Sequence, residues 1–191
     1  EKMGANAVVA EGCEAGGHIG ELTTMVLVPD IVRTVSIPVI AAGGIYDSKT
    51  ALAAFCLGAD AIQVGTRFIL ASECTAHQNY KNKIIKAKDI DSKVTGRVTG
   101  HPVRLIRNAL ARKMLAAEYE QGAVEVLEEM GSGSLRAAVV DGDIKQGSFM
   151  AGQVACMLGE EMTAKEIIED IFSSEQMNSV IKYASGFNKG N

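Results

Sequence analysis

The apolar residues of the first seventy positions form three short runs, and each run is followed by a loop of small residues. The runs cover residues 7–11, 38–42 and 61–65. Their apolar residues are nearly continuous rather than alternating with polar ones, which is typical of parallel strands covered on both faces. We therefore expect three parallel strands, each of which ends at a glycine-rich loop.

The segments between these runs have the hydrophobic spacing of helices. Residues 23–35 carry apolar side chains at helical intervals, although Pro29 must lie in the first turn of this helix or bend it. Asp47 is the expected N-cap of a helix over residues 48–57, and Gly58 is expected to end that helix. This alternation predicts either a doubly wound sheet or part of a (β/α)8 barrel. In both folds, ligands bind at the carboxyl ends of the strands, where the glycine-rich loops lie.

The pattern changes after Phe68. Residues 73–147 are expected to form an insertion of polar helices and loops without another strand–helix repeat. Residues 148–184 are expected to return to the core as helices, and one of these begins with the capping box TAKE at positions 163–166. Residues 185–191 are the expected frayed tail.

The composition is that of a soluble globular protein. The chain has 191 residues, of which 47% are hydrophobic and 22% charged, and its formal net charge is -4. These values are typical of soluble globular proteins, and the charge gives no general attraction to nucleic acid or anionic membranes. No apolar run is long enough for a bilayer, and no signal peptide is recognisable. The four cysteines lack metal-ligand spacing and the density of secreted disulfide scaffolds, so we expect a cytoplasmic protein.

No metal site is expected either. No Cys, Asp or Glu stands at ligand spacing around His77 or His101, so surface or capping roles are predicted for both histidines.

The glycine-rich loops are candidates for an anion site. Glycines at strand ends let backbone N–H groups approach an anion closely, and a following helix N-terminus adds a favourable dipole. The candidate residues in the second and third loops are Gly43, Gly44, Gln63, Val64, Gly65 and Thr66. A tight turn explains either glycine loop equally well when it is taken alone. Neither loop matches the dinucleotide or nucleoside-triphosphate fingerprint.

Three segments together resemble a known family. EGCEAGGHIG at 11–20, IPVIAAGGI at 37–45 and AIQVGTRF at 61–68 resemble the flavin-dependent enoyl-acyl-carrier-protein reductases, which are close relatives of the nitronate monooxygenases. The similarity continues through AHQNYK, TGHPVR and GSFMAGQ and covers nearly the whole chain. EAGGHIGELTTM and HPVR resemble the reductase branch more than the monooxygenase branch.

The resemblance implies an α/β fold, namely the C-terminal part of an FMN-binding (β/α)8 TIM barrel. Residues 1–72 would be its last three βα units, with a small helical insertion after the last strand. Such a barrel has about 250 residues, so the chain is expected to be a piece of a longer protein.

The resemblance also assigns a site. The residues implied for the FMN phosphate are Gly43, Gly44, Gln63, Val64, Gly65 and Thr66. Gly16 and Gly17 would lie beside the flavin, His18 would be the catalytic histidine over its ring, and Ser148 would be a further contact.

The implied reaction is a two-step hydride relay in fatty acid synthesis, from NADH or NADPH by way of FMN to the β-carbon of a trans-2-enoyl thioester. A proton ends at the α-carbon. An imidazole, with its ordinary pKa near 6.5, suits donation of a hydrogen bond or a proton near neutral pH. The sequence leaves open whether His18 protonates the carbon or polarises the carbonyl. Two alternatives also stay open: a nitronate monooxygenase that uses O2 in place of NAD(P)H, and an inactive fragment that binds an acidic partner.

Positive charge is concentrated in the insertion. Ten of the nineteen Lys and Arg residues lie between Lys81 and Lys113, against only two acidic residues. This segment is either a solvated helix face or a docking surface for acyl carrier protein bearing the enoyl thioester, with Arg104 and Arg107 as the first residues to test. The sequence leaves the oligomeric state open, and a homodimer would be ordinary for such a barrel.

Overall fold

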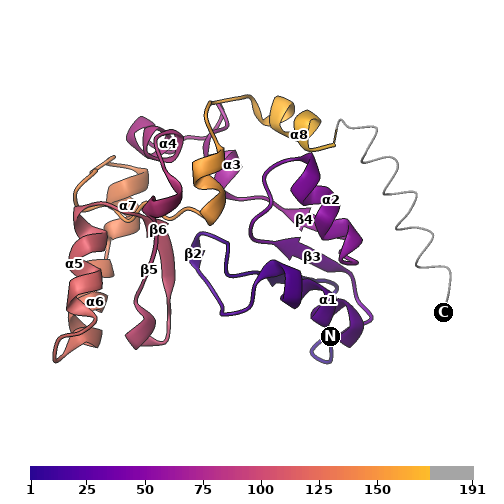
Figure 1. Cartoon of the computed structure of the whole chain (residues 1–191), viewed down its shortest axis with the longest axis horizontal. Coiled ribbons are helices and arrows are strands. Elements are labelled where there is room, and N and C mark those ends of the chain that lie inside the picture. Colours follow the sequence, from indigo (N-terminus) through magenta and orange to yellow (C-terminus); the bar gives the residue numbers. More distant parts are fainter. Residues whose placement is uncertain (173–191) are drawn as a thin grey trace. The chain divides into compact units, whose positions relative to one another are not determined.

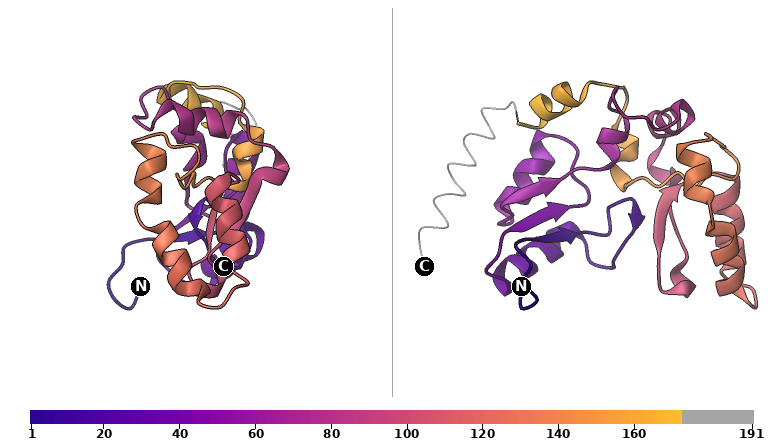
Figure 2. Two further views of the ribbon diagram at one scale, coloured as in Figure 1. Left: turned by 90° about the vertical axis from the view of Figure 1, so that its left-hand side faces the viewer. Right: turned by 180° about the vertical axis from the view of Figure 1, so that it is seen from behind.

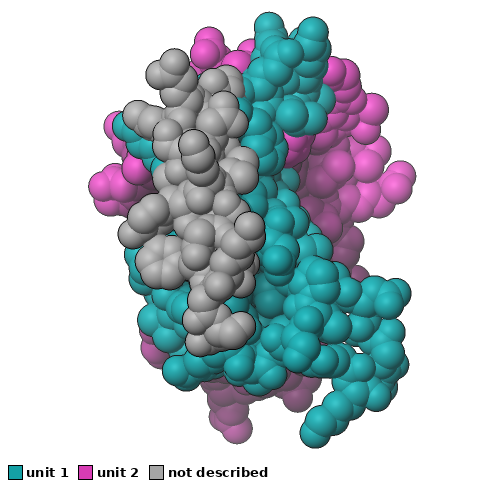
Figure 3. All heavy atoms as spheres, turned by 90° about the vertical axis from the view of Figure 1, so that its right-hand side faces the viewer, with its two compact units in different colours: residues 1–14, 20–64, 163–191 teal, residues 15–19, 65–162 magenta. Residues whose placement is uncertain are grey.

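The computed structural model describes residues 1–172, so the parts of the predicted helices and tail beyond them lie outside the described residues. The chain divides into two compact units, which are coloured separately in Figure 3. Unit 1 contains residues 1–14, 20–64 and the segment from 163 onward, and unit 2 contains residues 15–19 and 65–162. The division cuts through the glycine-rich stretch at 11–20, because residues 15–19 belong to unit 2 and the residues on either side of them belong to unit 1.

Unit 1 is built on a parallel sheet of three strands. These are β1 (Val8–Glu11), β3 (Val39–Ala42) and β4 (Ala61–Gln63), in the order β1-β3-β4. The last residue of β3, Ala42, pairs with the last residues of β1 and β4 (Figure 1), so the three carboxyl ends are level. The three predicted strands and their direction are confirmed. Burial on both faces holds for the central strand β3 alone, because β1 and β4 are edge strands with partly exposed residues.

The helices of unit 1 follow the sequence closely. They are α1 (Thr24–Thr34), α2 (Ser48–Cys56) and α8 (Ala164–Phe172). Asp47 caps α2 as predicted and accepts a hydrogen bond of 2.8 Å from the Thr50 N–H. Thr163 and Glu166 form the predicted capping box before α8. Pro29 lies inside α1 and beyond its first turn, so the first of the two alternatives expected for it is wrong, and the expected bend stays a prediction.

Unit 2 contains an antiparallel sheet that the sequence did not predict. Its strands are β2 (Gly17–His18), β6 (Val103–Ile106) and β5 (Ser92–Thr95), in that order. Figure 2 shows this sheet from two further sides. The insertion is therefore not purely helical. The strands escaped prediction because polar or small residues interrupt them, so they lack the continuous apolar runs that revealed β1, β3 and β4, and they are too short for a period-two pattern to stand out.

Short helices complete unit 2. They are α3 (Thr66–Ile69), α4 (Gln78–Ile85), α5 (Ala109–Ala117), α6 (Ala123–Gly131) and α7 (Ser134–Val139), with 3-10 turns η1 (Asp89–Asp91), η2 (Arg97–Thr99) and η3 (Gln153–Met157). Helix α5 packs against β5, and α6 packs against α5 and η2. Within the segment expected to be helical, η3 is a 3-10 turn in which Met157 is 63% exposed. No helix of residues 1–172 has the length and hydropathy to cross a membrane.

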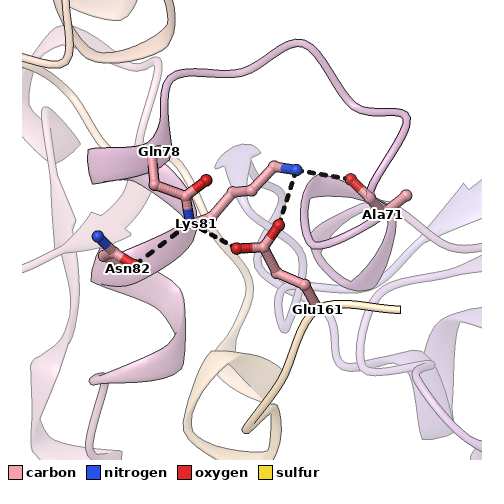
Figure 4. Close-up of polar contacts among 5 residues, drawn as sticks. All are labelled: Ala71, Gln78, Lys81, Asn82 and Glu161. Atoms are coloured by element: carbon pink, nitrogen blue, oxygen red, sulfur yellow. Dashed lines mark hydrogen bonds and ion pairs between the residues drawn. The ribbon is translucent and has the colours of Figure 1, made fainter. Parts of the chain in front are cut away.

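A buried lysine fastens α4 to two other segments of unit 2. The Lys81 side chain is 5% exposed, and its ammonium group lies 2.7 Å from the Ala71 carbonyl oxygen and 3.0 Å from a Glu161 carboxylate oxygen (Figure 4). Gln78 donates to the same carboxylate. These hydrogen bonds, from Gln78 first and then Lys81, hold the pKa of Glu161 below its ordinary value. The ammonium group of Lys81 is therefore paired with Glu161 inside unit 2 and is not part of an exposed basic surface.

Candidate functional site

The predicted phosphate loop of unit 1 lies at the carboxyl ends of the parallel strands. Gly43 and Gly44 follow β3 directly, beside the end of β4 at Gln63. Gly43 has a φ of +91°, and a Cβ atom built on it would lie 2.7 Å from the Gly12 carbonyl oxygen. The Gly12 N–H in turn donates to the Ala42 carbonyl oxygen at 2.9 Å. Gly43 is thus required by close packing of two backbone segments, whatever else this loop binds.

Glu14 and Thr24 tether this turn, and the sequence analysis missed both residues. The Glu14 carboxylate accepts from the Thr24 backbone N–H at 3.0 Å, at the first residue of α1. The Thr24 hydroxyl lies 2.8 Å from the Gly43 carbonyl oxygen. A carboxylate is favourable at a helix N-terminus, but Glu14 precedes Thr24 by ten residues, so no local spacing rule reveals the pair.

The predicted residues of the third loop fall in both units. Gln63 and Val64 belong to unit 1, and Gly65 and Thr66 belong to unit 2. Gly65 has a φ of -103°, and a Cβ atom built on it would meet no atom within 4 Å. Neither backbone strain nor packing against residues 1–172 requires glycine there, so its accessible backbone fits a bound group. The Thr66 Oγ1 accepts from the Gly152 N–H at 2.9 Å and keeps its own proton for donation.

In unit 2 the two reductase-like motifs are hydrogen-bonded strands. Gly17 pairs with Arg104 and His18 pairs with Val103 in the antiparallel ladder of β2 and β6. The Ile19 N–H donates to the Pro102 carbonyl oxygen at 3.0 Å. His18 is therefore carried on a strand of the insertion, and its own side chain is exposed.

The local structure favours glycine at both Gly16 and Gly17. A Cβ atom on Gly16 would lie 2.5 Å from the Ala151 carbonyl carbon, so the backbone of the GSFMAGQ motif occupies that space. Gly17 is buried, has a φ of +80° and lies against Met150, whose sulfur would be 3.6 Å from a Cβ atom. Close packing therefore explains Gly16 and the positive φ explains Gly17, and their predicted position beside a flavin stays a prediction.

The segment that contacts these glycines is firmly held. The Ile106 N–H donates to the Phe149 carbonyl oxygen at 2.9 Å, and the Tyr80 hydroxyl donates to the Met150 carbonyl oxygen at 2.6 Å. The rings of Tyr80 and Phe149 lie 5.1 Å apart, and burial raises the pKa of Tyr80 well above its ordinary value. These contacts fix the backbone on which Gly16 and Gly17 rest.

Unit 2 also contains a cavity of about 260 Å³ between its sheet and the helices α5 and α6. His18 lines it, together with the insertion residue His101 and the return-segment residue Ser148. The structure thus brings His18 and Ser148 to one cavity, both of them predicted site residues.

The structure also shows where His77, Arg104 and Arg107 lie, three further residues discussed from the sequence. His77 caps α4, its Nδ1 accepting from the Asn79 N–H at 3.0 Å, which confirms the predicted capping role. Arg104 is 7% exposed and its Nη1 lies 2.9 Å from the Ser92 Oγ, so its predicted surface position is wrong. Arg107 is 41% exposed and pairs with Asp91 at 3.0 Å. Residues 1–172 contain no group of three or more metal-ligating side chains placed to hold an ion.

The chain is similar to the nitronate monooxygenases, both to the family and to single curated proteins. The model of the nitronate monooxygenase family matches residues 1–174. A probable nitronate monooxygenase of Staphylococcus aureus (strain MSSA476) is 35% identical over 193 residues, which cover 96% of this chain and 54% of that protein. The chain therefore spans about half the length of the curated relatives it matches.

Two solved structures agree with the fold. FabK from Thermotoga maritima is 49% identical with a TM-score of 0.88, over 97% of this chain and 58% of that one. Nitroalkane oxidase from Streptomyces ansochromogenes is 26% identical with a TM-score of 0.76, over 95% of this chain and 54% of that one. Both are TIM barrels, so the predicted α/β fold, a part of a TIM barrel, is confirmed. The chain belongs to the nitronate monooxygenase family, whose members are flavin-dependent oxidoreductases.

Proposed function

We propose that the complete protein containing this chain is an FMN-dependent enoyl-acyl-carrier-protein reductase that uses NADH or NADPH. The observation that carries the proposal is the 49% identity with FabK, an enoyl-acyl-carrier-protein reductase, over 97% of the chain. The identity with the nitronate monooxygenase relative is 35%. The motifs EAGGHIGELTTM and HPVR support the same branch, because they resemble the reductases more than the monooxygenases.

The cofactor would be held at the strand ends. The residues that would bind its phosphate are Gly43, Gly44, Gln63, Val64, Gly65 and Thr66. The open space at Gly65 and the unused proton of the Thr66 hydroxyl suit a phosphate. Bound FMN would supply hydride transfer from NAD(P)H to the β-carbon of a trans-2-enoyl thioester.

His18 would complete the reduction. A hydride at the β-carbon leaves the α-carbon and the thioester oxygen with the electron pair of the former double bond, and one proton must reach the α-carbon. His18 is exposed and lines the cavity, on a strand fixed by the ladder to β6. Its imidazole can donate a hydrogen bond to the thioester oxygen or a proton to the α-carbon. Because β2 fixes the backbone, the imidazole needs little reorganisation.

The second candidate is a nitronate monooxygenase, which the family match and the names of the curated relatives favour. The same His18 would then act on an alkyl nitronate, with O2 as the oxidant in place of NAD(P)H.

One experiment separates the two. The complete protein is purified, its flavin spectrum is recorded under nitrogen, and NADH or NADPH is added, followed by crotonyl-CoA. Bleaching of the flavin band and its return with crotonyl-CoA support the reductase. Nitronate-dependent O2 uptake, without bleaching by either nicotinamide, overturns the proposal in favour of the oxidase.

Docking of acyl carrier protein is part of the proposal. Arg104 and Lys81 are buried, so the dock would use exposed cations of the same segment, namely Arg107, Arg112 and Lys113. Reversing the charge of these three should raise the KM for a carrier-bound enoyl substrate more than the KM for its CoA thioester. Equal changes in both KM values would contradict the docking surface.

A further inference from the structure

The cavity beside His18 is apolar on most of its lining. The side chains of Val103, Leu105, Met114, Leu127 and Met150 contribute to its walls. Met114 and Leu127 belong to the buried cluster of unit 2, so that end of the cavity continues into the apolar core. Val103 and Leu105 are alternate residues of β6, which places their side chains on the same face of the sheet. The cavity is thus a slot between this face and the helices α5 and α6.

Apart from Glu128, its polar side chains are imidazoles and hydroxyls, namely those of His18, His101, Thr95, Thr99, Ser134 and Ser148. His18 and His101 line it with exposed side chains, and Ser148 lines it while only 3% exposed. The Ser148 hydroxyl makes no hydrogen bond to another described residue, yet it is not sealed from solvent, so it can donate to a group inside the cavity. These groups suit a neutral carbonyl oxygen.

The charges around the cavity exclude an anion. Glu128 is among the lining residues, and no Lys or Arg of the described chain lines it. A phosphate or pyrophosphate would face a carboxylate without a counter-charge. The nicotinamide cofactor is therefore a poor occupant, and an uncharged chain with one carbonyl is a good one.

The size of the cavity sets the length of such a chain. Since a water molecule takes about 30 Å³ of liquid volume, a cavity of about 260 Å³ holds roughly eight groups of methylene size. The flexible thioethers of Met114 and Met150 allow the walls to adjust to chains of somewhat different length.

We propose that this cavity holds the acyl chain of the enoyl thioester, with the carbonyl end toward His18 and Ser148 and the methyl end toward Met114 and Leu127. The proposal rests on the reductase function proposed above. It makes the insertion, through α5 and α6, the part of the protein that selects acyl chain length.

Gly131, the last residue of α6, offers a sharp test. It lines the cavity, its φ is not positive, and a Cβ atom on it would meet only the Met114 methyl carbon at 3.8 Å, an ordinary contact. Gly131→Ala is therefore the matched control, and Gly131→Leu adds a side chain that fills the cavity. Both variants are made in the complete protein, and thermal melting checks that they fold.

In Gly131→Leu, kcat/KM for a trans-2-octenoyl thioester should fall by about tenfold or more, with little change for the four-carbon crotonyl thioester. Equal losses for both chain lengths, or no loss for either, would overturn the proposal.

A binding measurement keeps this test separate from the reductase assay. Calorimetry with saturated octanoyl-CoA should show binding to the wild type and to Gly131→Ala but not to Gly131→Leu. If the wild type reduces no enoyl thioester yet shows this pattern, the proposed reaction fails and the chain-binding cavity stands.

Photolabelling of the wild type covers the case in which Gly131→Leu does not fold. An octanoyl thioester with a terminal diazirine should label the peptide of residues 109–131. Labelling only of other segments would overturn the proposal.

Discussion

The two sheets use glycine in the same way but expose different chemistry. In unit 1, Gly43 packs against the backbone of Gly12 at the ends of parallel strands. In unit 2, Gly16 packs against the backbone of Ala151 beside an antiparallel strand. Both glycines are needed because two backbones touch. The parallel strands β1 and β4 of unit 1 end in the exposed polar residues Glu11 and Gln63, whereas β2 of unit 2 presents the imidazole of His18.

This contrast separates two roles that a glycine-rich motif combines. Glycines at these contacts are needed for folding, and the residues next to them carry the chemistry. Substitutions should therefore divide cleanly into those that lower turnover and those that lower stability.

The largest effect is expected from His18 itself. Because the side chain is exposed, His18→Ala should leave the melting temperature nearly unchanged, while turnover of the enoyl thioester should fall by about 100- to 10,000-fold, as for removal of a general acid. Steady-state kinetics and a thermal melt of the complete protein measure both. Tyr119→Ala is the control, since Tyr119 is 90% exposed and is not among the residues that line this cavity. Equal losses in both variants would show that His18 has no special role.

The next effect should be on stability in unit 1. Gly43→Ala combines a φ of +91° with a Cβ atom 2.7 Å from the Gly12 oxygen, so we expect a loss of about 3 kcal/mol in unfolding free energy. Gly4→Ala is the matched control, with a φ of +85° and no atom within 4 Å. It should lose only the strain cost of about 1 kcal/mol. Chemical denaturation measures the difference, and equal losses would rule out the backbone contact as the cause.

A smaller loss of unfolding free energy is expected from Lys81→Met in unit 2. The methionine keeps the volume but leaves the Ala71 carbonyl and the Glu161 carboxylate without their donor. Since Glu161 is 31% exposed and can reach water, we expect a loss of about 2 kcal/mol. Lys86→Met, at the exposed end of α4, is the control and should be neutral. Similar melting curves for both variants would show that the buried pair does not stabilise unit 2.

The smallest expected effect is on the pH dependence of the stability of unit 2. The folded pKa of Glu161 lies below its ordinary value, so its contribution to stability is present above the unfolded pKa of about 4.3 and is lost as pH falls through the folded pKa. Between pH 5 and pH 3 the wild type should therefore lose more stability than Glu161→Gln, by a few degrees of melting temperature at most. Parallel slopes for the two proteins would contradict this role.

The sequence predicted unit 1 better than unit 2 for physical reasons. In unit 1, caps such as Asp47 and continuous apolar runs act locally, so short windows of sequence reveal them. In unit 2, β5 and β6 are stabilised by pairing with each other, and that pairing has no signature within four residues. The same applies to the site, because the Glu14–Thr24 contact and the burial of Arg104 depend on distant segments. His18 was predicted because the local motif around it, EGCEAGGHIG, resembles a known family.

The position of β2 restricts how this family can be recombined. Residues 15–19 belong to unit 2 although unit 1 surrounds them in the sequence, and their hydrogen bonds run to Pro102, Val103 and Arg104. A chimaera that exchanged residues 65–162 between two relatives would give His18 a foreign strand partner. Exchange of acyl specificity by domain grafting therefore has to transfer two separate pieces of sequence, the five-residue loop together with the insertion.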